Sequence, residues 1–423
     1  MTRIKRLPDL IALAVALLVV AGCGGSKTAT PPPAAAPAPA PAAAPSPAPA
    51  QPAAPQGKPI LIGASVSQSG SYSGSGKYAL EGYQLWEEQV NQRGGLLGRP
   101  VKLVIYDDKS DPKTGAQLYE KLISDDKVDL IVGPYSSAVT AATVGVAEKH
   151  QMVMLSPEAS DTKIFSQGLK YAFQTQTIAD KYLEGAFDIA KKAGYKTAVL
   201  LYEDTAFPKS VSDAMPALSA KYGIQVLMNK SYPKDATDFS ALVTQAKQQN
   251  PDVLLGASYL PASMAIMRQA RELGLNAKMY AFTVGPSEQE FSNLGKTGEF
   301  VFGSTNWDPT LQTKGNKAFF DSYVKKFGHD PEYHSASNFA TMEIMEAAVK
   351  AVGSLDQNKL ADWLSKNELD TVYGHYQVDA KNIQVGFDAF LLQWLNGKKV
   401  LVWPENVASQ KWAVPAPPWS ERP

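Results

Sequence analysis

From residue 60 onward, short apolar runs alternate with amphipathic segments of helical periodicity, and this alternation constrains the fold more than any other feature. Continuous apolar runs of this length indicate strands that are buried on both faces, as in a parallel sheet covered by helices. The pattern therefore predicts an α/β fold built on parallel sheets. The predicted strands are residues 60–66, 101–108, 128–133, 152–156, 197–204, 224–229, 252–259 and 278–283.

The alternation is interrupted twice, over residues 157–178 and again over residues 284–300, and long helical segments return over residues 314–364. This interruption predicts two Rossmann-like lobes, joined by several crossovers around a central cleft that would hold a ligand. The expected division places residues 57–177 with 308–384 in lobe 1, residues 178–307 with 385–404 in lobe 2, and residues 405–423 in a C-terminal tail.

The N-terminus has the features of an exported protein. Residues 1–22 combine basic side chains with an apolar run that is too short to cross a bilayer but typical of a signal peptide. The motif "VAGC", which ends at Cys23, resembles the bacterial lipobox, in which the cysteine is lipidated and becomes the first mature residue. Residues 23–56 are rich in Pro and Ala and predict an extended tether. We expect a protein of the periplasm or cell envelope, held at the membrane by its lipid.

Composition and histidine placement argue against several other classes. Lys+Arg and Asp+Glu both total 41, so the charge balance gives no sign of nucleic-acid binding. His329 and His334 are spaced i and i+5 after a helix-breaking Pro, which favours two surface side chains over a metal-ligand pair. We expect no metal and no cofactor.

Two enzyme interpretations are weak. The run "GSGKYA" from Gly74 fits a dinucleotide fingerprint, and Asp107 ends the second predicted strand, where a ribose-binding acid belongs. The fingerprint is nevertheless separated from its strand, so an NAD-dependent enzyme is a distant alternative. No nucleophile elbow surrounds Ser136 or Ser137. We therefore expect a binding protein without catalytic activity.

Hydroxyl-rich turns follow two neighbouring predicted strands, "GPYSSAV" at residues 133–139 and "LSPEAS" at residues 155–160. Right-handed crossovers bring the carboxyl ends of parallel strands to one sheet edge, so both turns would face one crevice. The helix that begins near Ser137 offers free backbone amides and the positive end of its dipole. Ser137 could also be a plain N-cap, but the pair of turns predicts a site for a small carboxylate.

A family resemblance rests on longer motifs. "N-x-x-G-G-L-x-G-x-x-V" begins at Asn91, "Y-D-D-x-x-D-P" begins at Tyr106, and "IMRQARELGL" begins at Ile266. With the two turns, these motifs resemble the type I periplasmic solute-binding proteins from Pro59 to about Trp403. That family includes the Leu/Ile/Val-binding branch that feeds ABC importers, and the lipobox fits a lipoprotein form.

The resemblance implies specific ligand contacts. A serine in the first turn, here Ser137, and a hydroxyl in the second, here Ser160, would hold the carboxylate together with the backbone at Glu158. Tyr259 would close over the ligand from lobe 2. The acid that binds the ammonium group in relatives aligns with Thr283, which is a departure. Further residues expected in loops that line the cleft are Tyr72, Ser75 and Phe207.

The expected function is that of the solute-binding component of an ABC importer. It would capture a small hydrophobic amino acid of the branched-chain type and deliver it, as a monomer, to a membrane permease with ATPase subunits. The missing acid at position 283 keeps one alternative open, an aromatic or aliphatic carboxylic acid without an amine. A sensor subunit on the same scaffold is another.

Overall fold

The structure is a computed structural model that describes residues 24–25, 29–30 and 54–422. The predicted signal peptide, Cys23 and most of the predicted tether lie outside the described residues. The contacts divide the chain into residues 1–50 and a compact body, residues 51–423. None of the helices in the described part has the length and apolarity needed to cross a membrane.

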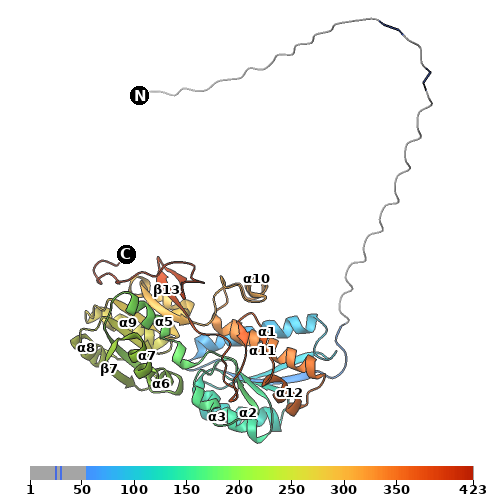
Figure 1. The fold of residues 1–423 in the computed structure, drawn as a ribbon. Helices are drawn as coiled ribbons and strands as arrows, with labels where there is room; N and C mark the ends of the chain where they lie inside the picture. Colours follow the sequence, from blue (N-terminus) through green and yellow to red (C-terminus); the bar gives the residue numbers. More distant parts are fainter. Residues whose placement is uncertain (1–23, 26–28, 31–53, 423) are drawn as a thin grey trace, which may run out of the picture. The chain divides into compact units, whose positions relative to one another are not determined.

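The first sheet of the body is parallel throughout, with strand order β2-β1-β3-β4-β5 (Figure 1). Every residue of β3, β4 and β5 is buried, as expected for strands covered on both faces. Its strands are β1 (Ile60–Val66), β2 (Val101–Asp107), β3 (Leu130–Val132), β4 (Met154–Ser156) and β5 (Ala172–Gln174).

The second sheet has the order β14-β13-β10-β9-β8-β6-β7. It is parallel from β7 to β10, whereas β13 and β14 run antiparallel to their neighbours as a hairpin. Its strands are β6 (Thr197–Glu203), β7 (Gln225–Tyr232), β8 (Val253–Ala257), β9 (Met279–Phe282), β10 (Val301–Thr305), β13 (Phe390–Leu395) and β14 (Lys398–Trp403). A short pair, β11 (Leu369–Asp370) and β12 (His375–Tyr376), lies apart.

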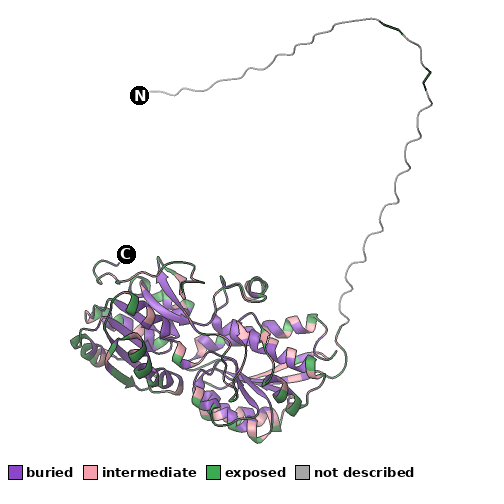
Figure 2. Cartoon of the chain, in the orientation of Figure 1, coloured by how far each residue is buried: buried purple, intermediate pink, exposed green. Residues whose placement is uncertain are grey.

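Helices cover both faces of each sheet, and the buried residues gather between them and the strands (Figure 2). The helices of the first lobe are α1 (Ser73–Gln92), α2 (Pro112–Ser124), α3 (Ser137–Lys149), α4 (Thr162–Phe165), α10 (Asn316–Phe327), α11 (Tyr333–Val352) and α12 (Gln357–Leu364). Those around the second sheet are η1 (Ala179–Lys181), α5 (Glu184–Lys192), α6 (Ala206–Asp213), α7 (Met215–Tyr222), α8 (Ser240–Gln248), α9 (Leu260–Glu272), η2 (Gly285–Ser287) and η3 (Gln289–Gly298).

The Asp-Asp motif that follows β2 has a structural role. The Asp107 carboxylate accepts hydrogen bonds from the backbone amides of Gln68 and Ser69, at 3.0 and 3.2 Å. The Asp108 carboxylate accepts from the hydroxyls of Ser65 and Ser67, at 2.8 and 2.7 Å. Both acids thus fix the loop between β1 and α1, so Asp107 serves this loop rather than the ribose contact considered for a dinucleotide enzyme.

The first lobe also depends on the close approach of α1 and α11, which lie side by side in Figure 1. A Cβ atom at Gly82 would stand 2.3 Å from the backbone oxygen of Ser335, so only glycine permits this contact. The Trp86 indole is fully buried and donates to Glu346 Oε2 at 2.9 Å. Together these contacts hold α1 and α11 against each other.

Residues beyond β14 are attached to the second sheet. The Ala416 amide donates to the Lys278 carbonyl at 2.8 Å, and the Trp419 indole donates to the Leu275 carbonyl at 2.8 Å. The Arg422 guanidinium lies 3.6 Å from the centroid of the Trp419 ring. The described part of the predicted tail is therefore packed against the second lobe.

The two-lobed α/β architecture confirms the predicted fold class, and each predicted strand is present within a few residues. Both sheets are mainly parallel, as predicted, and the β13–β14 hairpin adds two antiparallel pairings at one edge of the second sheet. Strand β5 lies inside residues 157–178, a segment in which no strand was predicted. The exact lobe boundaries stay a prediction.

Candidate functional site

A small cavity lies where the two lobes meet. It receives side chains from the turns after β3 and β4 in the first lobe, and from α6, the β8–α9 junction and the end of β9 in the second. Its volume is about 10 Å³, the room of a single water molecule. The lining residues are Tyr135, Ser136, Glu158, Ser160, Tyr182, Phe207, Tyr259, Val284 and Tyr333.

The two hydroxyl-rich turns meet at one sheet edge, as predicted. Ser137 was considered as a possible N-cap of the following helix, but the structure gives this role to its neighbour. Ser136, not Ser137, caps α3, and its hydroxyl accepts from the Val139 amide at 3.3 Å. The Ser137 hydroxyl accepts from the amides of Ser160 and Asp161, at 3.0 and 3.2 Å. Ser137 therefore joins the two turns, while its own O–H proton is left to donate.

Ser160 belongs to a buried chain of hydroxyl and amide groups. Its Oγ lies 3.0 Å from the Tyr182 hydroxyl, which also accepts from Asn306 Nδ2 at 2.9 Å. Asn306 follows β10, where the chain returns from the second sheet to the first lobe. The chain of contacts thus links the wall of the cavity to a connection between lobes.

Glu158 turns into the protein and pairs with a histidine. Its Oε2 lies 3.0 Å from His334 Nδ1, and its Oε1 accepts from Asn338 Nδ2 at 2.6 Å. The side chains of Glu158 and His334 are only 2% and 1% exposed. The surface position expected for His334 is therefore wrong, because the first turn of α11 faces inward against the turn after β4. His329 is partly exposed, as predicted.

Carboxylates set the protonation of this pair. Burial alone would lower the pKa of His334, but the charge of Glu158 and its hydrogen bond to the imidazole outweigh burial and raise the pKa above its usual value. The pair therefore favours the protonated histidine, while burial raises the pKa of Glu158 itself. Its Nε2 is buried without a partner among the described residues.

Aromatic rings form the remaining wall. Phe207 lies 4.8 Å from Tyr182 and 6.0 Å from Tyr259, measured between ring centroids. Tyr72 stacks behind the cavity at 4.4 Å from Tyr259, and its hydroxyl donates to Glu203 at 3.3 Å. Tyr72 therefore packs against Tyr259 and does not itself line the cavity.

Two predicted residues point elsewhere. Thr283 is fully buried, and its hydroxyl accepts from the Ser258 amide at 3.0 Å and donates to the Ser258 carbonyl at 2.9 Å. Its neighbour Val284 takes the place on the cavity wall. Ser75 donates to Glu288 Oε1 at 2.7 Å, so it connects α1 of the first lobe to the segment after β9 of the second.

Sequence reasoning missed several residues that line the cavity. Tyr135 lies in the turn at residues 133–139, next to the predicted serines, so its place on the wall can be inferred from the sequence. Tyr333 and Tyr182 gave no such signal, because they come from segments far from the hydroxyl turns in sequence. Across residues 24–25, 29–30 and 54–422, no group of three or more His, Cys, Asp or Glu side chains is arranged to hold a metal ion.

The sequence matches the family described as periplasmic binding protein over residues 59–399. The chain belongs to this family of solute-binding proteins, which are not enzymes and act outside the cytoplasm. The match covers the first sheet, the second sheet up to the start of β14, and every residue that lines the cavity.

Individual relatives agree with this assignment. The chain is 26% identical over 346 residues to the "Leu/Ile/Val-binding protein BraC3" of Rhizobium johnstonii, covering 81% of this chain and 93% of that protein. It is 25% identical over 343 residues to an "Amino acid binding protein" of Pseudomonas aeruginosa, covering 79% of this chain and 90% of that protein.

Solved structures share the fold. The substrate-binding protein LivJ of Streptococcus pneumoniae, in complex with isoleucine, superposes with a TM-score of 0.74 at 24% identity and covers 81% of this chain and 98% of its own. A solute-binding protein from R. palustris, in complex with benzoate, gives a TM-score of 0.75 at 20% identity and covers 85% of this chain and 97% of its own.

Proposed function

We propose that this protein is the extracytoplasmic solute receptor of an ABC importer, and that it captures a small hydrophobic amino acid in the interlobe cavity. The observation that carries the proposal is the cavity itself, where two hydroxyl turns and the start of α3 face aromatic side chains from the opposite lobe. Relatives named for leucine, isoleucine and valine support the choice of ligand.

The turns would hold the carboxylate. Ser160 and the backbone at Glu158 would contact it beside the free amides of the first turn of α3, where the helix dipole favours an anion. Ser137 would contribute its O–H proton and keep the two turns together. Phe207 and Tyr259 would enclose the apolar part of the ligand. A cavity of about 10 Å³ is smaller than any amino acid, so the lobes must separate for a ligand to enter.

Among the residues that line the cavity, no carboxylate oxygen is left without a hydrogen bond for an ammonium group. Thr283 has no charge and is bonded to Ser258, and both oxygens of Glu158 already accept hydrogen bonds. A desolvated ammonium needs an anionic partner. These observations favour a second candidate ligand, an aromatic or aliphatic carboxylate without an amine.

Calorimetry with matched ligands tests both candidates. Leucine is compared with 4-methylpentanoate, and phenylalanine with 3-phenylpropanoate, because each pair differs only in the amine. For an amino-acid receptor we expect the amine-bearing member to bind about tenfold or more tightly, as one charge-assisted hydrogen bond provides. Preference for the deaminated acid would select the second candidate. Binding of neither carboxylate, but of a sugar or an amide, would reject both.

We also propose that the mature protein is a monomer held at the membrane by a lipid on Cys23. The motif "VAGC" and the Pro/Ala-rich segment support this anchoring. We further propose the lobe boundaries expected from the sequence; the position of the strands of the first sheet, between residues 60 and 174, supports them.

Cys23→Ser is expected to release the protein into the soluble fraction or to leave an unprocessed precursor, because serine has no thiol to accept the lipid. Cell fractionation and gel mobility measure the outcome against the parent chain. A variant that fractionates with the membrane and migrates like the parent would show that Cys23 is not the anchor.

A further inference from the structure

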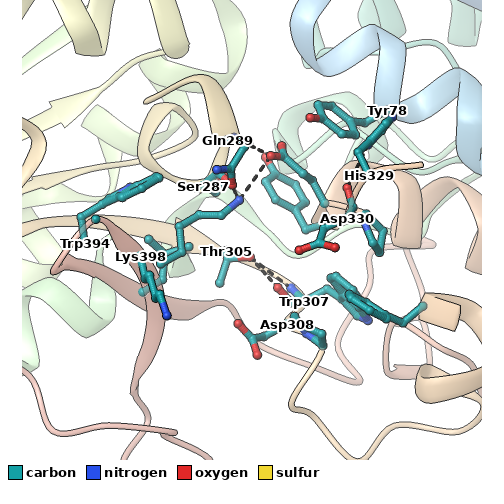
Figure 3. Close-up of a pocket in the computed structure, with 18 residues that line it drawn as sticks. Tyr78, Ser287, Gln289, Thr305, Trp307, Asp308, His329, Asp330, Trp394 and Lys398 are labelled. Atoms are coloured by element: carbon teal, nitrogen blue, oxygen red, sulfur yellow. Dashed lines mark hydrogen bonds and ion pairs between the residues drawn. The ribbon is translucent and has the colours of Figure 1, made fainter. Parts of the chain in front are cut away.

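A second, larger pocket opens beside the lobe contact and has no place in the function proposed above. Its volume is about 530 Å³, within the range of small-molecule sites. Figure 3 shows Trp394 and Lys398 on one side, and Tyr78, His329 and Asp330 on the other. The first pair belongs to β13 and β14 of the second sheet, and the others to α1 and the loop before α11, so both lobes form the pocket.

The walls of this pocket are aromatic. Trp307 and Trp394 are each 3% exposed, and Tyr78 is 4% exposed. The indole nitrogens of the tryptophans already donate, Trp307 to Asn316 and Trp394 to the Pro286 carbonyl, so their rings rather than their N–H groups are left for a ligand. Aromatic faces attract cations through the ring quadrupole.

A buried carboxylate in the wall has one oxygen without a partner. Glu332 Oε1 accepts from the Gln289 amide at 2.5 Å and from Lys399 Nζ at 3.2 Å. Glu332 is also the N-cap of α11, where it forms a capping box with Ser335, but its Oε2 is buried and makes no hydrogen bond among residues 54–422. The side chain of Glu332 is only 2% exposed. An unpaired buried carboxylate oxygen is costly, and a ligand that donates a proton to it would recover that cost.

The remaining charges make the pocket negative. Asp308 and Asp330 also line it. Burial raises the pKa of the Tyr78 hydroxyl, and the charge of Glu332 adds to this shift. Of the basic side chains that line the pocket, two already have hydrogen-bond partners and the third lies at the rim. Lys399 donates to the Ser287 carbonyl as well as to Glu332, and His329 Nε2 lies 3.3 Å from Glu81. Lys398 is exposed at the rim.

We propose that this pocket is a second binding site, specific for a small organic ammonium ion with an apolar body. The ammonium group donates to Glu332 Oε2, and the apolar body lies against Trp307, Trp394 and Tyr78. Since both lobes contribute walls, an occupant stabilises their closed arrangement. Tyr333 lines this pocket and the cavity between the hydroxyl turns, so the two sites share a side chain.

The test uses the full chain without added solute and follows tryptophan fluorescence during titration with benzylammonium, benzyl alcohol or benzoate. We expect benzylammonium to bind about tenfold or more tightly than the neutral alcohol, because only the cation gains the charged contact. Glu332→Gln should abolish this preference. Glu290→Gln is the matched control, since Glu290 Oε2 is also buried without a partner but the residue does not line the pocket.

Two further variants keep the test decisive if Glu332→Gln does not fold. Lys398→Glu replaces a cation at the exposed rim with an anion and should tighten benzylammonium binding several-fold. Phe207 lines the small cavity but not the second pocket, so Phe207→Ala should leave the affinity for benzylammonium unchanged. Equal binding of all three probes, or loss of benzylammonium binding in Phe207→Ala, would overturn the proposal without affecting the proposed solute receptor.

Discussion

Glu158→Leu is expected to lower the free energy of unfolding by about 3–5 kcal/mol at neutral pH, the usual cost of removing one partner of a buried ion pair. The variant leaves the His334 imidazolium buried without its counter-charge and Asn338 without its acceptor. Chemical denaturation of the solute-free protein measures the loss. Glu158→Leu combined with His334→Leu should recover much of it, because two apolar side chains need no counter-charge.

A second Glu–His pair in the chain provides the control. Glu120 lies 2.8 Å from His150 and 2.7 Å from Lys149, but its side chain is 37% exposed. Removing an exposed ion pair costs about 1 kcal/mol or less, so Glu120→Leu should change stability little. Equal losses in Glu120→Leu and Glu158→Leu would show that burial of the Glu158–His334 pair does not determine its contribution.

The free energy of unfolding is expected to fall as the pH rises, because the carboxyl group of Glu288 is buried in the folded protein. Burial raises the pKa of this carboxyl from 4.5 to about 8, with Glu332 and Glu290 adding to the shift and His334 opposing it. In the folded, closed protein Glu288 therefore keeps its proton at neutral pH. It is hydrogen bonded to Ser75 across the lobe contact.

The sign follows from proton linkage. Below pH 4.5 the carboxyl is protonated in folded and unfolded chains alike, so its full contribution to stability is present. As the pH rises from 4.5 to about 8, only the unfolded chain loses the proton, and stability is lost by up to about 1.4 kcal/mol per pH unit. Above that window the loss is complete.

Denaturation at intervals from about pH 5 to about pH 8 measures this slope. Glu288→Gln keeps an acceptor for Ser75 but cannot titrate, so it should flatten the profile. Glu120→Gln is the control, because hydrogen bonds from Lys149 and His150 lower the pKa of Glu120 and its ionisation is complete in this range. A profile of the same slope in the parent and in Glu288→Gln would assign the pH dependence to other groups.

The parts of the fold that could be predicted are those with continuous apolar runs. Strand β1 has the predicted bounds, and β6 differs by a single residue, because each carries a long uninterrupted apolar run. Strand β5 has only 3 residues and depends on its pairing with β4. The hairpin of β13 and β14 was missed although Asn396 and Gly397 between two apolar runs are a strong turn signal.

The candidate site could be predicted only where contacts are local or follow strand order. The turns that contain Ser137 and Ser160 meet because β3 and β4 are adjacent in the sheet. The pairing of Glu158 with His334 joins residues 176 positions apart and needs the packing of α11 against the first sheet. No periodicity in the sequence distinguishes a histidine that faces inward at a helix start from one on the surface.

The two ends of the compact body are fixed to different lobes. The Gln56 amide donates to the Gly98 carbonyl beside the first sheet, at 2.9 Å, whereas Ala416 is hydrogen bonded to Lys278 beside the second. Donor and acceptor dyes placed near residues 56 and 416 would therefore be attached to different lobes. Energy transfer between the dyes would report the separation of the lobes on single molecules. Neither the small cavity between the hydroxyl turns nor the second, larger pocket would be chemically changed.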